Sequence, residues 1–281
     1  GPDEGDLRLL QLIERTEIPY WYPTDKMMFI GERWGDMYVP LHHEGMSRVD
    51  QFYTKRNLWA LSAMFHQIQV EAKGRVRLRN ALLMLFTSVC TSLTSKLTRY
   101  NFGNRGNGYL SGTLYVPSYV AATRVDKVLR SKVRDLQTIH QRKELGDAIV
   151  TTQSSTDLQN IPSDSVDYIF IDPPFGRNLM YSELNFLWEA WLRVFTQNEP
   201  EAIVNQSQRK QIDEYRDLMH RCFLEMYRVL KPNRWITVEF HNSKASIWNA
   251  IQDSLSRAGF VVAQVAALDK QQSSYKQVTA P

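Results

Sequence analysis

The chain has 281 residues, with 34 Lys and Arg against 30 Asp and Glu and a net charge of +4. Hydrophobic residues make up 43% and charged residues 23%, a globular composition that excludes intrinsic disorder, collagen and coiled coil. No apolar run approaches the roughly 20 residues of a membrane-spanning helix, so no membrane partner is expected. Two cysteines cannot form a disulfide framework, which favours a cytoplasmic protein.

The first 50 residues predict an irregular arm. Their apolar residues show weak periodicity, and Pro19 and Pro23 interrupt any helix. Gly1 and Pro2 resemble the pair of residues left by a protease cut, so we expect an internal fragment of a longer natural chain. The aromatic residues of this arm are expected to pack against a neighbouring part of the protein.

Residues 51–145 predict a helical region. Apolar side chains recur at spacings of three and four from residue 51 to residue 71, as on one face of a helix. Two further helices are expected over residues 78–97 and 120–145. A short strand over residues 112–116 is expected between them.

Basic side chains gather in the same region. Residues 71–145 carry 14 Lys and Arg and 4 Asp and Glu, a net charge of +10. Aromatic residues and glycines alternate with them, a mixture that suits the phosphates and bases of a nucleic acid. The candidates for DNA contact are Arg99, Tyr100, Arg105 and Tyr109. A solvated basic face and a plain surface loop are the alternative interpretations.

From residue 146 to residue 281 the pattern alternates between strands and helices. The run at residues 166–171 is apolar and β-branched, as expected for a buried parallel strand. This alternation predicts an α/β sheet of the doubly wound type. The other expected strands cover residues 148–152, 235–240 and 260–266, and the expected helices cover residues 181–195, 211–230 and 244–257.

Asp172, Pro173, Pro174 and Phe175 directly follow the strongest predicted strand, at the edge where open α/β sheets bind ligands. The two prolines stiffen the loop and offer no N–H, so their carbonyls are held as acceptors. A carboxylate, a carbonyl and an aromatic ring suit the exocyclic amine of adenine or cytosine. The acceptors would hold both N–H bonds and localise the nitrogen lone pair, while the ring stacks on a flipped-out base. An ordinary Asp-Pro-Pro turn is the alternative.

Residues 171–176 resemble the catalytic motif of amino-group DNA methyltransferases, which use S-adenosylmethionine to methylate N6 of adenine or N4 of cytosine. The resemblance extends over about residues 50–281, and it is closest to a bacterial and archaeal subgroup whose larger members carry a zinc ribbon. It implies a Rossmann-like methyltransferase sheet, incomplete if the chain is a fragment, with a helical, basic N-terminal or inserted region. The implied domains are an arm over residues 1–50, a region for DNA recognition over residues 51–145, and a catalytic core over residues 146–281.

The resemblance also implies roles for individual residues. Catalysis would fall to Asp172, Pro173, Pro174 and Phe175. The cofactor would contact Ser154, Ser155, Asp157 and Asp172, together with Thr54, Arg56 and Asn57, for which a plain helix start capped by Thr54 is the alternative. Tyr181 and Glu183 would line the base or the methionine side of the site. No metal is expected.

The chain departs from the family at the glycine-rich turn that holds the cofactor. Its one dense glycine cluster, residues 103–112, is basic and follows a helix, which is the wrong context for such a turn. Two explanations stay open: the sequence begins after the cofactor motif, or the chain is a degenerate, non-catalytic relative.

Three functions follow from these patterns. Methylation of DNA at adenine N6 is favoured, because Asp as the first residue of the motif is more frequent in adenine enzymes. Methylation of RNA or of another planar amine is the second hypothesis, and a DNA-binding module without turnover is the third. Beyond DNA, the expected partners are the missing part of the natural chain or a component of a restriction-modification or defence system.

Overall fold

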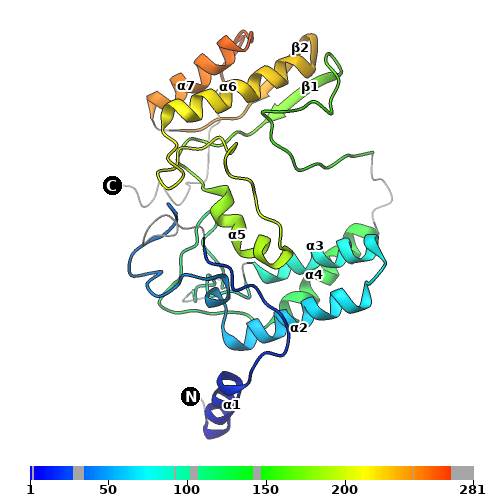
Figure 1. Cartoon of the computed structure of the whole chain (residues 1–281), viewed down its shortest axis with the longest axis vertical. Coiled ribbons are helices and arrows are strands. Elements are labelled where there is room, and N and C mark those ends of the chain that lie inside the picture. The colour runs from blue at the N-terminus through cyan, green and yellow to red at the C-terminus, as the bar shows by residue number, and fades with distance from the viewer. Residues whose placement is uncertain are drawn as a thin grey trace. The chain divides into compact units, whose positions relative to one another are not determined.

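The chain forms two compact units, which we describe separately in this computed structural model (Figure 1). The first unit contains residues 1–152 and 173–215, and the second contains residues 153–172 and 216–281. The structure describes residues 1, 3–27, 35–91, 93–101, 107–141, 147–242 and 244–266.

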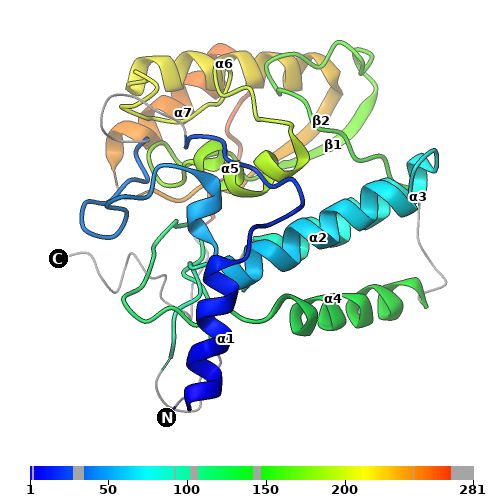
Figure 2. The same ribbon diagram turned by 60° about the horizontal axis from the view of Figure 1, so that its bottom comes forward.

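The first unit is helical. Its elements are α1 (Glu4–Arg15), a 3₁₀ helix η1 (Val49–Phe52), α2 (Lys55–Glu71), α3 (Val76–Cys90), α4 (Val125–His140) and α5 (Tyr181–Leu192). Figure 2 shows α4 beside the α2–α3 pair, which it contacts. The predicted helices of this region are thus confirmed, although α3 ends seven residues before the expected position at residue 97. The side chain of Thr94 explains this early end, because its hydroxyl donates to the Val89 carbonyl at 2.7 Å.

The prediction of an irregular arm is wrong for α1. A capping box starts this helix: the Asp3 carboxylate accepts from the Asp6 N–H at 2.8 Å, and the Asp6 carboxylate accepts from the Asp3 N–H at 3.1 Å. α1 buries no side chain, and its leucines at positions 7, 9, 10 and 12 are all more than half exposed. Pro19, which was expected to interrupt a helix, lies after α1 has ended.

The core of the first unit lies between α2, α3 and α5. Trp191 is fully buried, and its ring centroid lies 5.9 Å from that of Phe65 and 5.2 Å from that of Phe86. Leu187 and Ala190 of α5 are buried in the same cluster. Because these side chains complete the core of the N-terminal helices, α5 groups with them rather than with the residues on either side of it in the sequence.

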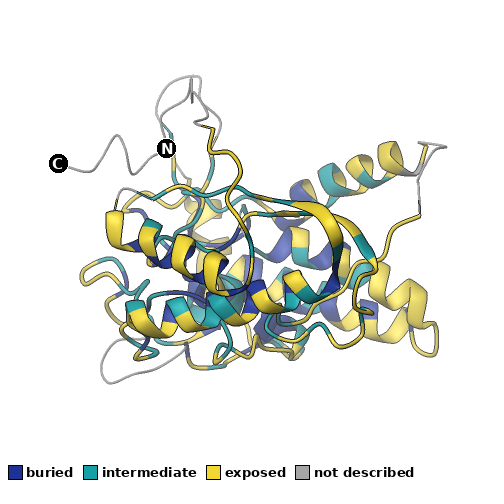
Figure 3. Cartoon of the chain, turned by 90° about the horizontal axis from the view of Figure 1, so that it is seen from above, coloured by how far each residue is buried: buried dark blue, intermediate teal, exposed yellow. Residues whose placement is uncertain are grey.

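The second unit contains two parallel strands, β1 (Val166–Ile171) and β2 (Leu230–Val238), with α6 (Ile212–Val229) leading directly into β2 and α7 (Ala245–Arg257) following it. The first four residues of α6 belong to the first unit. Tyr168 pairs with Trp235 and Phe170 with Thr237. Figure 3 shows buried residues along one side of the helices and exposed residues along the other.

The sheet is smaller than the sequence predicts. β1 has the expected bounds, but the prediction that it is buried is wrong: none of its residues is buried, and Tyr168 and Phe170 are 55% and 59% exposed, because the two-stranded sheet leaves their side chains uncovered. The predicted strands over residues 112–116, 148–152 and 260–266 form no strand in the structure. Ile149 is 93% exposed, as expected for an apolar run that finds no partner edge. The α/β class is confirmed, whereas the described residues form a two-stranded sheet in place of the predicted doubly wound one.

Within the described residues, no helix combines the length and the apolar character that crossing a membrane requires.

The Glu225–Arg228 pair of α6 ties down the segment that leads into β1. Glu225 accepts from the Leu158 N–H at 2.7 Å, and Arg228 donates to the carbonyls of Leu158 and Ile161 at 2.9 and 3.0 Å. Hydrogen bonds from Arg228 and from the Leu158 N–H lower the pKa of Glu225 to about 2.

Replacement of Glu225 by glutamine is therefore expected to reduce the free energy of unfolding at pH 7 by about 1 kcal/mol. Since the pKa is lower in the folded than in the unfolded state, this stabilisation is complete above the unfolded value. It is lost as the pH falls from there through about 2. Urea unfolding at several pH values should show the variant and wild-type curves converging in acid. Glu4→Gln, at an exposed carboxylate of α1, should change little at any pH; a constant difference for Glu225→Gln would contradict the electrostatic origin.

Candidate functional site

The Asp-Pro-Pro-Phe motif starts at the carboxyl end of the parallel sheet. Asp172 follows β1 directly, and at this edge the Glu239 N–H, just after β2, donates to the Ile171 carbonyl at 2.9 Å. The side chain of Asp172 is exposed, Pro173 is buried, and Pro174 and Phe175 are half-buried. The strand thus delivers a carboxylate that solvent and a substrate can reach.

Two hydrogen bonds hold the carbonyls that follow. The Pro174 carbonyl accepts from the hydroxyl of Tyr215 at 2.7 Å, and the Gly176 carbonyl accepts from the Val204 N–H at 3.1 Å. Gly176 has a φ of 64°, a conformation that favours glycine and turns the chain away from the motif. Tyr215 escaped the sequence analysis because it lies 41 residues after Pro174 with no local pattern that links the two.

Glu183 lies inside the first unit, only 2% exposed. Its carboxylate accepts from the Asp36 N–H at 3.0 Å, the Met37 N–H at 2.7 Å and the Asn205 side-chain amide at 2.9 Å. Burial raises the pKa of Glu183, against these hydrogen bonds, which lower it. A Cβ on Gly35, at φ +92°, would lie 2.5 Å from the Glu183 carboxyl carbon. Glu183, which was predicted to line the base or the methionine side of the site, lies in this internal network of the first unit.

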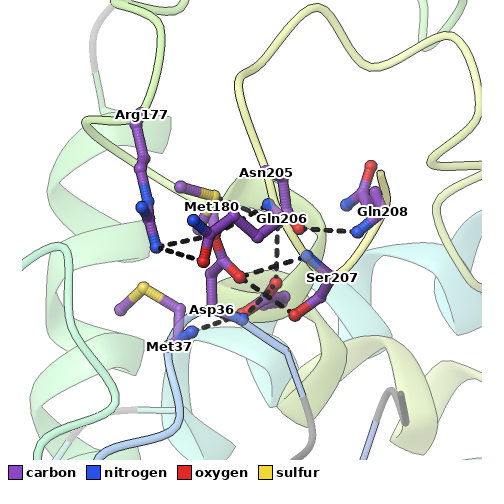
Figure 4. A network of polar contacts seen from close by, with 9 residues as sticks. Asp36, Met37, Arg177, Met180, Asn205, Gln206, Ser207 and Gln208 are labelled. Atoms are coloured by element: carbon purple, nitrogen blue, oxygen red, sulfur yellow. Dashed lines mark hydrogen bonds and ion pairs between the residues drawn. The ribbon is translucent and has the colours of Figure 1, made fainter. Parts of the chain in front are cut away.

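Asp36 extends this network to the loop after the motif (Figure 4). Its carboxylate forms an ion pair with Arg177 at 3.2 Å and accepts from the N–H of Gln206 at 3.1 Å and the hydroxyl of Ser207 at 2.9 Å. The Asn205 amide also contacts the Met180 sulfur at 3.2 Å. Three segments distant in sequence therefore meet around the loop: residues 35–37, 177–183 and 205–208.

The predicted cofactor residues fall into two groups. Thr54, Arg56 and Asn57 lie at the start of α2 in the first unit. The Thr54 hydroxyl accepts from the Asn57 N–H at 3.3 Å, so Thr54 caps the helix. The Asn57 side chain is buried, and its amide donates to the carbonyls of Thr94 and Thr123, both at 2.8 Å. Arg56 donates to the Ala122 carbonyl at 3.1 Å.

The second group, Ser154, Ser155 and Asp157, precedes β1 in the second unit. Ser154 shares a hydrogen bond of 2.8 Å with the Thr156 hydroxyl. Ser155 and Asp157 are exposed, and the Asp157 carboxylate accepts from the Gln159 N–H at 3.2 Å. Their polar groups are open to a ligand, unlike the side chain of Asn57.

The predicted DNA contacts lie on the first unit. The backbone of Arg99 bridges to those of Gly108 and Val120, so Arg99 and Tyr100 are held beside the segments 108–109 and 119–120. Tyr100 and Tyr109 are 52% and 44% exposed, and Tyr181, at the start of α5, is 38% exposed. Arg105 lies outside the described residues.

The two cysteines, Cys90 and Cys222, are buried and form no disulfide. Burial raises the pKa of Cys222 to about 11 and raises that of Cys90 further, so neither thiol is ionised near neutral pH. Over the described ranges, no cluster of three or more His, Cys, Asp and Glu side chains could hold a metal ion.

One comparison with known proteins gives a match, to the C-terminal part of the chain. Residues 166–280, less than half of the chain, match a family model for N6/N4 enzymes described as DNA methylase. Searches of curated proteins and of solved structures found no match. The matched region begins at β1 and contains the motif, α5, α6, β2 and α7. The match supports DNA amino-methyltransferase activity, with DNA as the substrate.

Proposed function

We propose that this protein transfers a methyl group from S-adenosylmethionine to the exocyclic amino group of a DNA base, with adenine N6 favoured. The observation that carries the proposal is the Asp-Pro-Pro-Phe motif at the carboxyl end of β1. It lies inside the region that matches the DNA methylase family. The exposed Asp172 carboxylate precedes the Pro174 carbonyl, whose position is fixed by Tyr215.

These groups explain how an aromatic amine becomes a nucleophile. The Asp172 carboxylate and the Pro174 carbonyl each accept one N–H of the amine, which favours a pyramidal nitrogen with a localised lone pair. The half-buried Phe175 ring stacks on the flipped base and fixes its pose. S-adenosylmethionine supplies a methyl group on a sulfonium. The activated nitrogen would take the methyl carbon from the sulfonium, the electron pair of the carbon–sulfur bond would stay on sulfur, and the surplus amine proton would leave through Asp172 to water.

The residues that would hold the methyl donor come from the segment before β1. Ser155 and Asp157 are exposed, and the Asp157 carboxylate can accept hydrogen bonds from hydroxyl or amino groups of an adenosine. Thr54 and Asn57 do not fit this role, because helix capping and main-chain carbonyls engage their side chains. Arg56 is exposed but also donates to a main-chain carbonyl.

The test is to incubate the chain with labelled S-adenosylmethionine and mixed-sequence duplex DNA, digest the DNA, and identify the labelled nucleoside. Labelled N6-methyldeoxyadenosine is the expected product, and unlabelled RNA should compete poorly. A label on cytosine N4 would overturn the choice of base, and preferential labelling of RNA would overturn the substrate. Salt-sensitive DNA binding without any label would instead support a DNA-binding module.

A further inference from the structure

The motif loop contains carbonyls that must find their donors outside the loop. Pro173 and Pro174 have no N–H, so these two residues cannot donate hydrogen bonds to carbonyls of the same loop. Tyr215 supplies the donor for Pro174 at 2.7 Å, and the Val204 N–H supplies the donor for Gly176 at 3.1 Å. Residues 173–215 all belong to the first unit, so this arrangement lies within one compact body.

Tyr215 is itself rigidly placed. It lies in the first turn of α6, its side chain is 0% exposed, and its own N–H donates to the Gln211 carbonyl at 3.2 Å. A buried ring on a helix has little rotational freedom, because its neighbours and the helix restrict its rotamers. The position of the hydroxyl is therefore set by the buried ring, and the Pro174 carbonyl is oriented toward it.

A carbonyl oxygen has two lone pairs, so it can accept a second hydrogen bond while the first is in place. Tyr215 takes one of them. The hydrogen bond from Tyr215 restricts the orientation of the peptide plane. It therefore also restricts the direction of the second lone pair. On the proposed function, that second position receives an N–H of the target amine.

We propose that Tyr215 is a positioning residue for methyl transfer: by donating to the Pro174 carbonyl, it fixes the acceptor that holds the target amine. Tyr215 touches neither the base nor the methyl donor. The inference rests on the proposed function, but the hold of Tyr215 on the loop can be measured without any turnover.

The test replaces Tyr215 by phenylalanine, which removes only the hydroxyl. We expect the turnover number for methyl transfer to fall about tenfold, which is the effect expected from losing one hydrogen bond to an acceptor of the target amine. The KM for DNA and the KM for S-adenosylmethionine should stay nearly unchanged. Hydrogen exchange at the amides of residues 175–178 should become faster. Thr94→Val is the matched control, because it removes another buried hydroxyl that donates to a main-chain carbonyl at 2.7 Å, in the helical core.

The control separates positioning from general stability. Thr94→Val should lower the thermal midpoint without changing the turnover number or exchange in residues 175–178. If both variants lost turnover equally, Tyr215 would have only a structural role and the proposal would be wrong. If Tyr215→Phe changed neither the turnover number nor the hydrogen exchange, the proposal would also be refuted. If wild-type protein transfers no methyl group, the proposed function fails, while the exchange measurement still decides whether Tyr215 holds the loop.

Discussion

Replacing Asp172 by alanine is expected to lower the rate of methyl transfer about 100-fold, which corresponds to about 2.7 kcal/mol of transition-state stabilisation. The carboxylate is exposed at the end of β1, so the substitution leaves no buried group without a partner. It removes one of two acceptors for the amine, and the nitrogen lone pair then stays delocalised in the base. Asparagine keeps one acceptor oxygen and loses the charge, so Asp172→Asn should fall between alanine and wild type.

Single-turnover rates at saturating DNA and donor measure this effect directly. Asp167→Ala is the matched control: it removes a carboxylate from the same strand, where Asp167 pairs with Lys231 and Arg234 at the surface. The control should transfer methyl groups at the wild-type rate. Asp172 was also predicted to touch the cofactor, and a rise in the KM for S-adenosylmethionine would reveal that second role. An unchanged rate for Asp172→Ala would remove the carboxylate from the mechanism.

The sequence predicts this part of the molecule well because its determinants are local. Residues 166–171 form an apolar, β-branched run with the expected bounds, and the motif that follows is recognisable from four consecutive residues, although the predicted burial of this strand is wrong. The helices from α2 to α7 follow from apolar spacing, since each buries one face. α1 was missed although its leucines recur at helical spacing, and none of its side chains is buried.

Contacts between distant residues could not be predicted. Residues 148–152 have a good strand composition, yet a strand exists only where a neighbouring edge accepts it, and composition does not reveal that edge. Tyr215 and Pro174 meet across 41 residues. Glu183 looks like a site residue in the sequence because it follows the motif closely, but its partner Asp36 lies 147 residues away. Only the tertiary structure shows that this carboxylate is buried.

Glu183→Ala is expected to destabilise the first unit by about 3 kcal/mol, because it leaves one buried and two partly buried donors without their acceptor. The donors are the N–H groups of Asp36 and Met37 and the amide of Asn205. For a unit of this size the thermal midpoint should fall by about 6 to 12 °C. Glu44→Ala, which removes an exposed carboxylate from a loop of the same unit, should change it little.

Glu183→Gln distinguishes this anchoring role from contact with substrate. Burial raises the folded-state pKa of Glu183 above its unfolded value, so the folded protein binds more protons in the window just above that value. The stability contributed by this group therefore falls as the pH rises through the window, and glutamine should abolish that fall. Glutamine also places an N–H₂ group, which cannot accept a hydrogen bond, beside the three donors. The variant should therefore be less stable than wild type at low pH, where wild-type Glu183 is protonated. If Glu183 instead contacted a base, Glu183→Gln would lower the rate of methyl transfer while the thermal midpoint stayed constant, and the buried network would not be its function.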